Sequence, residues 1–402
     1  MRITGWRVHL NSPGRNFLTL ELETDTGLVG LGDGTLNGRE HAVRAYLEEH
    51  LLPCLEGRDA FATEDFWQYA YRGAYWRRGP VTMTAIGAVD LALWDLKGKV
   101  LGVPVYQLLG GRCRQGVMAY THCHGQSVPA LIESAKAKQA EGFRALRLQC
   151  AVPGLDEVYG APKAAVYEPA EEGALPKEEI WDTAKYLDFA PELFGQARAA
   201  LGSTPHLLHD AHHRLTPIEA ARLGQALEPY RLFWLEDAVT GELQEAFRLV
   251  RQHTTTPLAL GEVFSTVFDI HQLITNQWID YVRMAPTHGG GLTALRKIAA
   301  LAEPYHVRMA CHGPSDISPI GLAAAIHFGL ATHNAAIQEF MGHPPETLTV
   351  FKPAYRFDNG YLNPGEEPGL GVAFDTKAAA AHPYRRAYLP TARLEDGTAW
   401  SW

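Results

Sequence analysis

The sequence is poor in cysteine, in long apolar runs and in excess charge of either sign, and each shortage excludes a class of protein. Only 5 of its 402 residues are cysteine, and they are scattered without a C-x-x-C pair, which excludes a disulfide-stabilised scaffold. No run of about 18 apolar residues occurs, so we expect no membrane span. The 36 Lys+Arg and 45 Asp+Glu residues give a net charge of −9, without the basic footprint of a nucleic-acid-binding protein.

What the chain does contain is the composition of a folded protein. Hydrophobic residues make up 46% and charged residues 20%, which is close to the average for globular domains. The length fits two or three domains, or one barrel with a cap. The first residues lack the apolar stretch of a secretory signal, so we expect a cytoplasmic protein.

The first part of the chain has the patterns of an α+β domain. Apolar residues alternate with Thr and Glu over 17–23, and a second strand follows at 28–32, the period of half-buried strands. Helical periodicity then covers 39–55 and 84–101. The Gly-Gly pair at 110–111 marks a break, so we place the first domain at 1–112.

From about residue 113 the chain alternates short apolar segments with helical stretches. This pattern predicts βαβ units and a parallel sheet, and eight such units fit a closed barrel. The barrel domain is placed at 113–375, and the segment 376–402 is expected to return to the first domain. The predicted strands are 117–122, 145–150, 206–212, 232–237, 257–262, 281–286, 307–313 and 337–340.

One connection is unusually long. About 55 residues separate the strand at 145–150 from the next one, and 153–176 is rich in Pro, Gly, Ala and Glu. Such a connection is typical of a functional or a disordered loop.

Three acids form the strongest chemical signal. Asp210, Glu236 and Glu262 each end an apolar strand, at two intervals of 26 residues. The C-terminal ends of barrel strands share one face, where active sites are built. Carboxylates that converge there repel one another unless a cation neutralises them, and oxygen ligands suit Mg²⁺ or Mn²⁺. The structural alternative, acids as helix caps, explains one such residue better than three in register.

Further polar residues lie at the same height. On a continuing strand His212 points to the side of Asp210 and His213 points away. Together these residues would form a pocket for a small hydroxylated anion, although each of them could equally make structural hydrogen bonds. The other polar residues at or beside strand ends are Arg147, Gln149, Arg283, His312 and Glu339. A zinc hydrolase is the weaker alternative, because His122 and His124 share a face without a third histidine at ligand spacing.

Two motifs now resemble a known superfamily. The stretch ALWDLKGK at 92–99, followed by GVPVYQLLGG at 102–111, resembles the capping-domain signature of the enolase superfamily. The acid series at 210, 236 and 262 resembles its Mg²⁺ site. The resemblance implies a modified TIM barrel, (β/α)7β, under an α+β capping domain built from both chain ends. It also implies removal of a proton α to a carboxylate, which gives a metal-stabilised enediolate.

Within this superfamily the chain resembles the mannonate dehydratases. Many relatives carry a Lys-x-Lys base on the second barrel strand, where this chain has Arg147-Leu148-Gln149. Others pair an Asp on the sixth strand with a His on the seventh, where this chain has Arg283 opposite His312. These departures argue against a racemase or a cycloisomerase.

The resemblance implies a role for each site residue in converting D-mannonate to 2-keto-3-deoxy-D-gluconate and water. Tyr159 is the base, assisted by Arg147, and His212 is the acid that protonates the departing 3-hydroxyl group. Asp210, Glu236 and Glu262 bind one Mg²⁺ per subunit, with Mn²⁺ as an alternative. The residues expected to position the acid sugar or close its pocket are Asn37, His122, Arg283, His312, Asp316, Glu339 and Trp402.

Two other functions stay open at this point. The first is dehydration of another acid sugar, such as D-gluconate, because the strand pattern does not fix the stereochemistry at C2 or C3. The second is a catalytically poor relative that binds an acid sugar. We also expect a homo-oligomer, a tetramer or higher, by resemblance, and no nucleic-acid or membrane partner.

Overall fold

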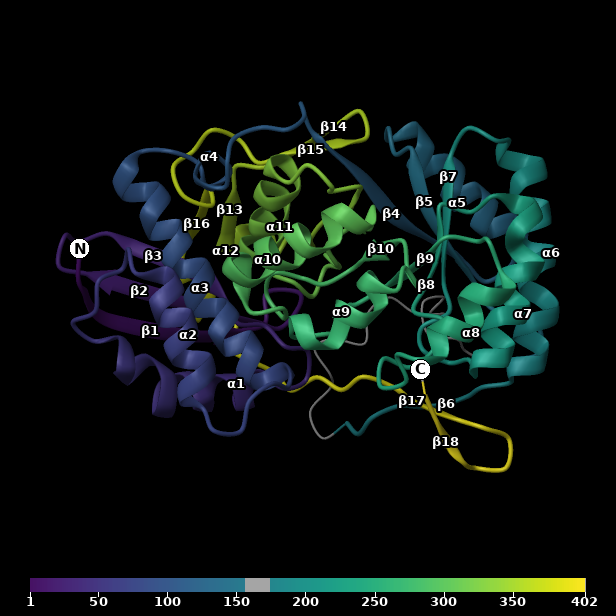
Figure 1. Cartoon of the computed structure of the whole chain (residues 1–402), viewed down its shortest axis with the longest axis horizontal. Coiled ribbons are helices and arrows are strands. Elements are labelled where there is room, and N and C mark those ends of the chain that lie inside the picture. Colours follow the sequence, from purple (N-terminus) through teal and green to yellow (C-terminus); the bar gives the residue numbers. More distant parts are fainter. Residues whose placement is uncertain (156–173, 402) are drawn as a thin grey trace.

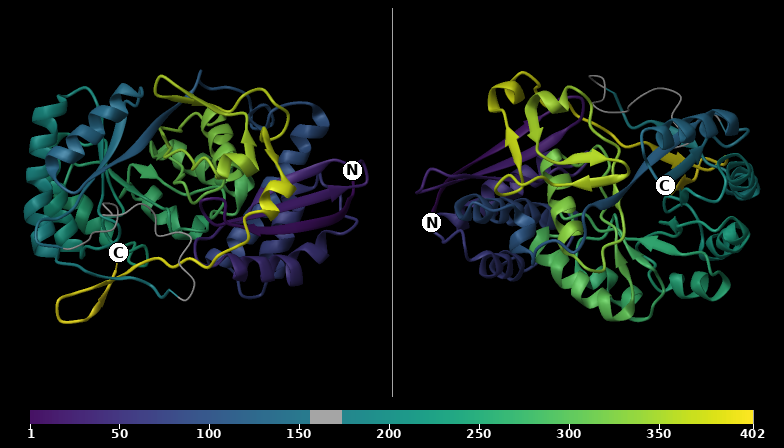
Figure 2. Two further views of the ribbon diagram at one scale, coloured as in Figure 1. Left: turned by 180° about the vertical axis from the view of Figure 1, so that it is seen from behind. Right: turned by 90° about the horizontal axis from the view of Figure 1, so that it is seen from above.

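The computed structural model of the chain describes residues 1–155 and 174–401. It has two parts, a small sheet covered by helices and a larger barrel (Figure 1). In the right-hand view of Figure 2, the barrel strands lie inside and its helices lie outside. The enolase-like fold predicted from the sequence is confirmed, with an α+β cap beside a (β/α)7β barrel.

The N-terminal part is a three-stranded antiparallel sheet in the order β1-β2-β3, packed against the long helix α3. The sequence patterns did not single out β1 or α2. In β1 the register shifts between Ile3 and Gly5, so its alternation is interrupted near its start. The elements of this part are β1 (Ile3–Asn11), β2 (Phe17–Thr24), β3 (Val29–Asp33), α1 (Glu40–Tyr46), η1 (Leu47–Leu51), η2 (Leu52–Leu55), α2 (Thr63–Gly73), α3 (Pro80–Leu101) and α4 (Val105–Leu108).

Helix α3 is apolar around most of its circumference because both parts of the molecule cover it. The polar residue in the middle of the 92–99 motif is Asp95, and its carboxylate makes hydrogen bonds to two other parts of the chain. Its Oδ2 accepts the backbone N–H of Leu31 at 2.9 Å, and its Oδ1 accepts that of Leu370 at 2.8 Å. Trp94 donates its indole N–H to Thr293 Oγ1 at 3.0 Å. These side chains tie the helix to the small sheet and to the barrel.

All eight predicted barrel strands are present, though most are shorter than the sequence pattern suggested. The barrel closes where β12 pairs with β4 and where Met309, on β11, bridges to Ala335. In the described part of the barrel, seven helices alternate with the eight strands. The strands are β4 (Val117–Gly125), β5 (Ala145–Cys150), β7 (His206–Asp210), β8 (Trp234–Glu236), β9 (Leu258–Leu260), β10 (Tyr281–Val282), β11 (Arg308–Met309) and β12 (Gln338–Glu339). The helices are α5 (Val128–Ala140), α6 (Thr183–Leu201), α7 (Pro217–Leu227), α8 (Ala246–His253), α9 (Val267–Thr275), α10 (Gly291–Ala302) and α11 (Pro319–Ala331).

Local capping fixes where the barrel helices begin. Thr216 and Glu219 form a capping box at α7, with Pro217 as the first helical residue, and Thr266 with Asp269 does the same at α9. These interactions satisfy backbone N–H groups that have no partner within the helix. They fix where the loop from β7 gives way to α7 and where the loop from β9 gives way to α9.

The C-terminal segment runs from the small sheet to the barrel, as the yellow trace shows in Figures 1 and 2. Ser12 donates its backbone N–H to His382 O at 2.9 Å, and Tyr384 donates its hydroxyl to Glu40 at 2.9 Å. The end of the segment then pairs with β6, in the connection after β5. The limits 112 and 375 between domains stay a prediction. The remaining elements are β6 (Glu178–Ile180), η3 (Glu228–Tyr230), η4 (Glu303–Tyr305), α12 (Thr347–Val350), β13 (Phe351–Pro353), β14 (Arg356–Asp358), β15 (Tyr361–Asn363), β16 (Val372–Phe374), α13 (Thr376–Ala380), β17 (Thr391–Arg393) and β18 (Ala399–Trp400).

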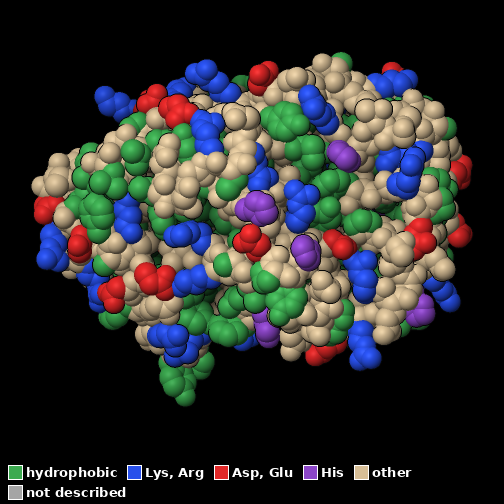
Figure 3. Space-filling view, turned by 45° about the horizontal axis from the view of Figure 1, so that its top comes forward, with side chains coloured by type: hydrophobic (Ala, Val, Ile, Leu, Met, Phe, Trp, Pro, Cys, Tyr) green, Lys and Arg blue, Asp and Glu red, His purple; other side chains and the backbone are tan. Residues whose placement is uncertain are grey.

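The surface carries charges of both signs. On the face drawn in Figure 3, Lys and Arg side chains are interspersed with Asp and Glu. Among the described residues, no helix combines the length and hydropathy needed to cross a bilayer.

Candidate active site

The barrel interior has two layers of side chains, one apolar and one charged. The apolar layer consists of Tyr120, Ala145, Leu208, Trp234, Ala259, Ala310, Ala336 and Ile337, with Tyr281 packed against it. Two residues further along seven of these strands, a second layer begins nearer their C-terminal ends. Its members are His122, Arg147, Asp210, Glu236, Arg283, His312 and Glu339.

Strand β9 is the exception to this two-residue step. Two residues after Ala259 comes Gly261, whose φ of +137° suits glycine alone. A Cβ there would lie 3.2 Å from the backbone nitrogen of Arg283. The chain therefore turns at Gly261, and Glu262 reaches the charged layer one residue later than the other strands predict.

The carboxylates at the strand ends form two groups that share Asp237. Oxygen atoms of Asp210, Glu236 and Asp237 all lie within 4.8 Å of one another, and ligand atoms of His213, Asp237 and Glu262 do the same. Asp210 and Glu236 are direct partners in the β7–β8 register. The structure thus brings the three predicted ligands to one rim, but places Glu262 in the second group.

Two buried arginines neutralise this rim from opposite sides. Arg147 Nη1 lies 2.7 Å from Glu236 Oε1 and 3.0 Å from Asp210 Oδ2. Arg283 is fully buried, with Nη1 2.7 Å from Asp237 and 2.8 Å from Glu262. Such pairs are retained where charges have a function, because desolvating them is costly.

The histidine of β4 joins the two ends of this network. Arg147 donates to His122 Nδ1 at 3.0 Å, and the opposite nitrogen of His122 lies 2.5 Å from Glu339. Glu339 Oε2 also accepts a hydrogen bond from Nη2 of Arg283 at 3.0 Å. Burial lowers the pKa of His122 to about 4, so its imidazole is neutral, accepting from Arg147 and donating to Glu339.

Burial also changes the acids themselves. It raises the pKa of Glu236 to about 8 and that of Asp237 to about 7. Glu262 behaves oppositely, because His312 and His213 outweigh burial and hold its pKa well below the usual range. Carboxylates that crowd together in this way are stabilised by a proton or a cation placed between them.

The orientation predicted for His213 is wrong. Strand β7 ends at Asp210, and both His212 (φ 54°) and His213 (φ 62°) adopt positive φ, so the alternation of a strand does not continue. The Nε2 atom of His213 lies 3.8 Å from both Asp237 and Glu262. His212 also faces the rim, with Nε2 3.8 Å from Glu262. Both histidines therefore border the carboxylates.

The cap supplies polar groups to the far side of the mouth. Asn37, from the β3–α1 loop, donates its amide to Asp316 Oδ2 at 3.1 Å, and His312 Nε2 lies 3.4 Å from Glu262. Asn37 Oδ1, Asp316 Oδ1 and His312 Nδ1 are buried and have no hydrogen-bond partner among the residues described. Buried polar atoms are normally paired, so these atoms indicate a place where a polar ligand binds.

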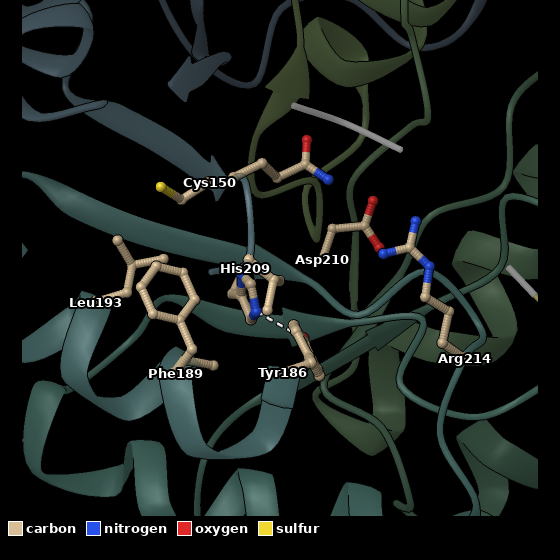
Figure 4. Close-up of a pocket in the computed structure, with 10 residues that line it drawn as sticks. Cys150, Tyr186, Phe189, Leu193, His209, Asp210 and Arg214 are labelled. Carbon is tan, nitrogen blue, oxygen red and sulfur yellow. Dashed lines mark hydrogen bonds between the residues drawn. The ribbon is translucent and has the colours of Figure 1, made fainter. Parts of the chain in front are cut away.

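A pocket lies beside Asp210, between the ends of β5 and β7 and helix α6 (Figure 4). Its polar wall includes Gln149, Asp210 and Arg214, and the side chains of Asp210 and Arg214 point toward each other. Tyr186 donates its hydroxyl to His209 at 2.7 Å, the dashed line of Figure 4, while the other ring nitrogen of His209 meets Leu148 O at 3.1 Å. This arrangement holds the strand end that carries Asp210.

Two predicted site residues, Tyr159 and Trp402, lie outside the described residues. Asp237 was missed by the sequence analysis, although it directly follows Glu236. Its backbone φ of 47° turns it toward the same rim, where an extended strand would have turned it away. Tyr120 was also missed. Its hydroxyl oxygen accepts a hydrogen bond from Nη2 of Arg283 at 3.0 Å.

The donor set fits a hard divalent cation. Asp210, Glu236 and Asp237 offer oxygen atoms alone, and Asp237 Oδ1 is buried without a hydrogen-bond partner in the described part of the chain. Mg²⁺ and Mn²⁺ favour such ligands. Beside them lie cationic groups and neutral imidazoles, a combination that suits a small hydroxylated carboxylate.

Comparison with known proteins places this geometry in a family. Residues 11–110 match the model of the mandelate racemase / muconate lactonizing enzyme N-terminal domain, and residues 130–378 match that of the enolase C-terminal domain-like family. Over the full length of both chains, the sequence is 58% identical to a D-mannonate dehydratase of Sphingomonas sp. (strain SKA58). It is 56% identical to a D-galactonate dehydratase family member, ManD, of Chromohalobacter salexigens, again over both full lengths.

A solved structure agrees with these relatives. The crystal structure of an enolase from Pantoea ananatis with bound D-gluconate and Mg has a TM-score of 0.92 and 38% identity, and the match covers 100% of each chain. The chain therefore belongs to the enolase superfamily and, within it, to the family of the mannonate dehydratases.

Proposed function

We propose that this protein is a Mg²⁺-dependent hydro-lyase that converts D-mannonate to 2-keto-3-deoxy-D-gluconate and water. The observation that carries the proposal is the rim of carboxylates at the ends of β7, β8 and β9, faced by Arg147 and His212. The full-length identity of 58% to a D-mannonate dehydratase supports the choice of substrate.

The metal site consists of Asp210, Glu236 and Glu262, with Asp237 close to all three. These residues would hold a Mg²⁺ ion, which would supply a Lewis acid for the substrate carboxylate and so make the C2 proton more acidic. Arg147 contributes a fixed positive charge on the same side, because its guanidinium contacts Asp210 and Glu236.

The dehydration breaks two bonds of the substrate. Tyr159, assisted by the charge of Arg147, removes the C2 proton. A cation beside a phenol favours its ionised form, which a tyrosine with an ordinary pKa of about 10 requires at neutral pH. The C3–O bond then breaks as the hydroxyl group receives a proton, and tautomerisation of the resulting enol gives the 2-keto product.

His212 is the acid that protonates the departing 3-hydroxyl group. Burial lowers the pKa of His212 to about 4 in the protein alone. A bound carboxylate substrate acts in the opposite direction, since a nearby negative charge raises the pKa of an imidazole. An imidazole suits this role, because its ordinary pKa lies near neutrality.

The other site residues position the substrate. Asn37 and Asp316 hold the side covered by the cap. The wall beside the metal ligands is formed by His122, Arg283, His312 and Glu339. Trp402, which the resemblance assigns to the pocket, lies outside the described residues.

The test is a screen of the purified protein against a panel of acid sugars, with Mg²⁺ and then with EDTA. The readout is the formation of 2-keto-3-deoxy products. We expect Mg²⁺-dependent turnover of D-mannonate above its epimers. Silence of the metal-loaded protein across the panel would contradict the proposal and favour a catalytically poor acid-sugar-binding relative.

D-gluconate is the second candidate substrate. The Pantoea ananatis enolase, with a TM-score of 0.92, was crystallised with D-gluconate and Mg. D-mannonate and D-gluconate differ in configuration at C2, so they present the C2 proton to opposite faces. Preferential turnover of D-gluconate would retain the metal site and the fold but reassign the base.

Tyr159 can be tested separately. A Tyr159→Phe variant removes only the hydroxyl group and should lower kcat at least 100-fold, with little change in Mg²⁺ affinity. Unchanged turnover would remove this residue from the mechanism. A Tyr75→Phe variant is the matched control, because Tyr75 is 85% exposed.

We further propose that the protein is a cytoplasmic homo-oligomer, a tetramer or higher, with domains at 1–112 and 113–375 and a returning segment at 376–402. Light scattering coupled to size-exclusion chromatography tests the assembly. A monomer at micromolar concentration would contradict it.

A further inference from the structure

A histidine with no role in the proposed reaction lies at the side of the barrel mouth covered by the cap. His343 follows β12, and its ring nitrogens are buried without a well-formed hydrogen bond among the described residues, although the backbone carbonyl of Ser315 lies close to the ring. Asn37 Oδ1 and Asp316 Oδ1 are also buried without a hydrogen-bond partner among the described residues. A buried polar atom without a partner costs free energy, and Asp316 is near enough to His343 to influence its charge, so a ligand that pairs with these atoms would be favoured here.

The position of His343 is fixed from both parts of the molecule. Its ring meets that of Phe17 edge to face, with centroids 6.5 Å apart. Pro344 packs so closely on Gly14 (φ +80°) that a Cβ added there would lie 2.9 Å from Pro344 Cβ. Thr347 donates its hydroxyl to Pro13 O at 2.7 Å. The loop that carries His343 is therefore held against the β1–β2 loop of the cap.

The surroundings of His343 suit a hydroxyl group better than a charged one. Arg15 and Asp316 are both close enough to influence it, and Arg15 donates to Ser315 Oγ at 3.1 Å. Burial, with Arg15, lowers the pKa of His343 to about 4. A neutral imidazole has one donor and one acceptor, as a sugar hydroxyl group does.

The topology places this group far from the metal ligands. Asp210, Glu236 and Glu262 lie at the ends of β7, β8 and β9, the third to fifth strands of the barrel. Asp316 and His343 follow β11 and β12, the seventh and eighth strands. In a closed eight-stranded barrel these sets lie across the mouth from each other, so a chain molecule with its carboxylate at the metal extends toward His343.

We propose that His343 is a further substrate-binding residue that forms, with Asn37 and Asp316, the subsite for the hydroxyl groups farthest from the carboxylate of the acid sugar. This assignment rests on the proposed function for the direction in which the substrate lies. It makes His343 a determinant of chain length, since an acid too short to reach the subsite cannot use it.

The test compares His343→Ala with wild type on two substrates that differ in length. These are D-mannonate and a four-carbon 2,3,4-trihydroxy acid of the same configuration at C2 and C3. We expect KM for D-mannonate to rise roughly tenfold, the effect of one or two lost neutral hydrogen bonds, with kcat changed less than twofold. The kinetic constants for the four-carbon acid should not change. A His343→Asn variant should recover part of the loss, because an amide also donates and accepts.

An equal rise of KM for both acids, or no rise for D-mannonate, would overturn the proposal. His333→Ala is the control, because the His333 side chain is 83% exposed.

A second readout separates this proposal from the proposed function. Acid-sugar-induced thermal stabilisation, measured with Mg²⁺, should be smaller in His343→Ala for six-carbon acids only. If wild type makes no product but shows this length dependence, the function fails and the subsite stands. If no acid sugar stabilises wild type, both fail.

Discussion

The two layers inside the barrel come from the same strands, yet their contributions to the protein are opposite. At Leu208 and Trp234 the interior is apolar and fully buried, whereas two residues later Asp210 and Glu236 place carboxylates at the same depth of burial. Burying apolar surface stabilises the fold. Burying charges costs free energy unless they are paired, and here two arginines and a cation site supply the pairing. The apolar layer thus supports the barrel, and the charged layer is kept for chemistry.

The largest effect should come from the charged layer. Glu236→Gln removes a metal ligand and should lower turnover about 1,000-fold or more, while the metal-free protein should melt within a few degrees of wild type, since amide and acid have the same shape. Mg²⁺ titration and turnover measure the first, and a thermal melt the second. Glu133→Gln is the control, because the Glu133 side chain is 71% exposed. Survival of metal-dependent activity would contradict the assignment of the metal site.

A change in the apolar layer should have the reverse signature. Leu208→Ala removes a fully buried side chain and should lower the free energy of unfolding by about 3 kcal/mol, with kcat changed less than twofold. Urea denaturation measures this loss, with Leu243→Ala, at a side chain 46% exposed, as the control. A loss below about 1 kcal/mol would show that the layer does not support the barrel.

Trp234 tests the link between the layers. Its indole N–H donates to Glu236 Oε2, so Trp234→Phe removes a hydrogen bond to a buried carboxylate and should cost about 2 kcal/mol. The same change should weaken Mg²⁺ binding severalfold, because Glu236 loses a group that orients it. Denaturation and calorimetry measure the two effects, and Trp76→Phe, at a residue 86% exposed, is the control. A stability loss with unchanged Mg²⁺ affinity would show that the layers act independently.

A buried acid outside both layers should change only the stability of the protein, and only as the pH changes. Asp90, in α3, accepts the backbone N–H of Thr293 at 3.0 Å, and burial raises its pKa to about 7. The unfolded chain ionises near pH 3.9, so the stability contributed by neutral Asp90 is complete below about pH 4 and is lost as the pH rises to about 7. The Asp90→Asn variant lacks this loss.

We therefore expect the difference in unfolding free energy between Asp90→Asn and wild type to shift in favour of the variant by about 3 kcal/mol between pH 4.5 and pH 8. Other titrating groups are common to both proteins and cancel. Denaturant titrations at the two pH values measure the shift. A constant difference would mean that Asp90 is already ionised at the lower pH.

Most of the fold followed from local pattern. The eight barrel strands were predicted because each is a short apolar run between helical stretches, and their ends are the positions where active-site side chains of such barrels lie. Asp210, Glu236 and Glu262 could be found this way because each directly ends its strand. The alternation over 17–23 correctly predicted a strand there, although β2 is buried on both faces and not on one.

The local pattern was insufficient where the backbone leaves the strand. His213 and Asp237 reach the rim through positive φ angles of 62° and 47°, and two-residue alternation assigns a side wrongly once the strand has ended. Gly261 shows the same limit, because its φ of +137° decides how Glu262 enters the charged layer.

The sequence by itself determined the barrel, its strand ends and the acidic character of its rim, because these depend on periodicity and on residue type. Only the tertiary structure decided that Asn37 meets Asp316, which lies 279 residues later, and that Arg283 joins carboxylates from three different strands. Such contacts depend on how the cap packs on the barrel and how the barrel closes. No local propensity encodes either, because the free energy comes from surfaces that meet only in the folded chain.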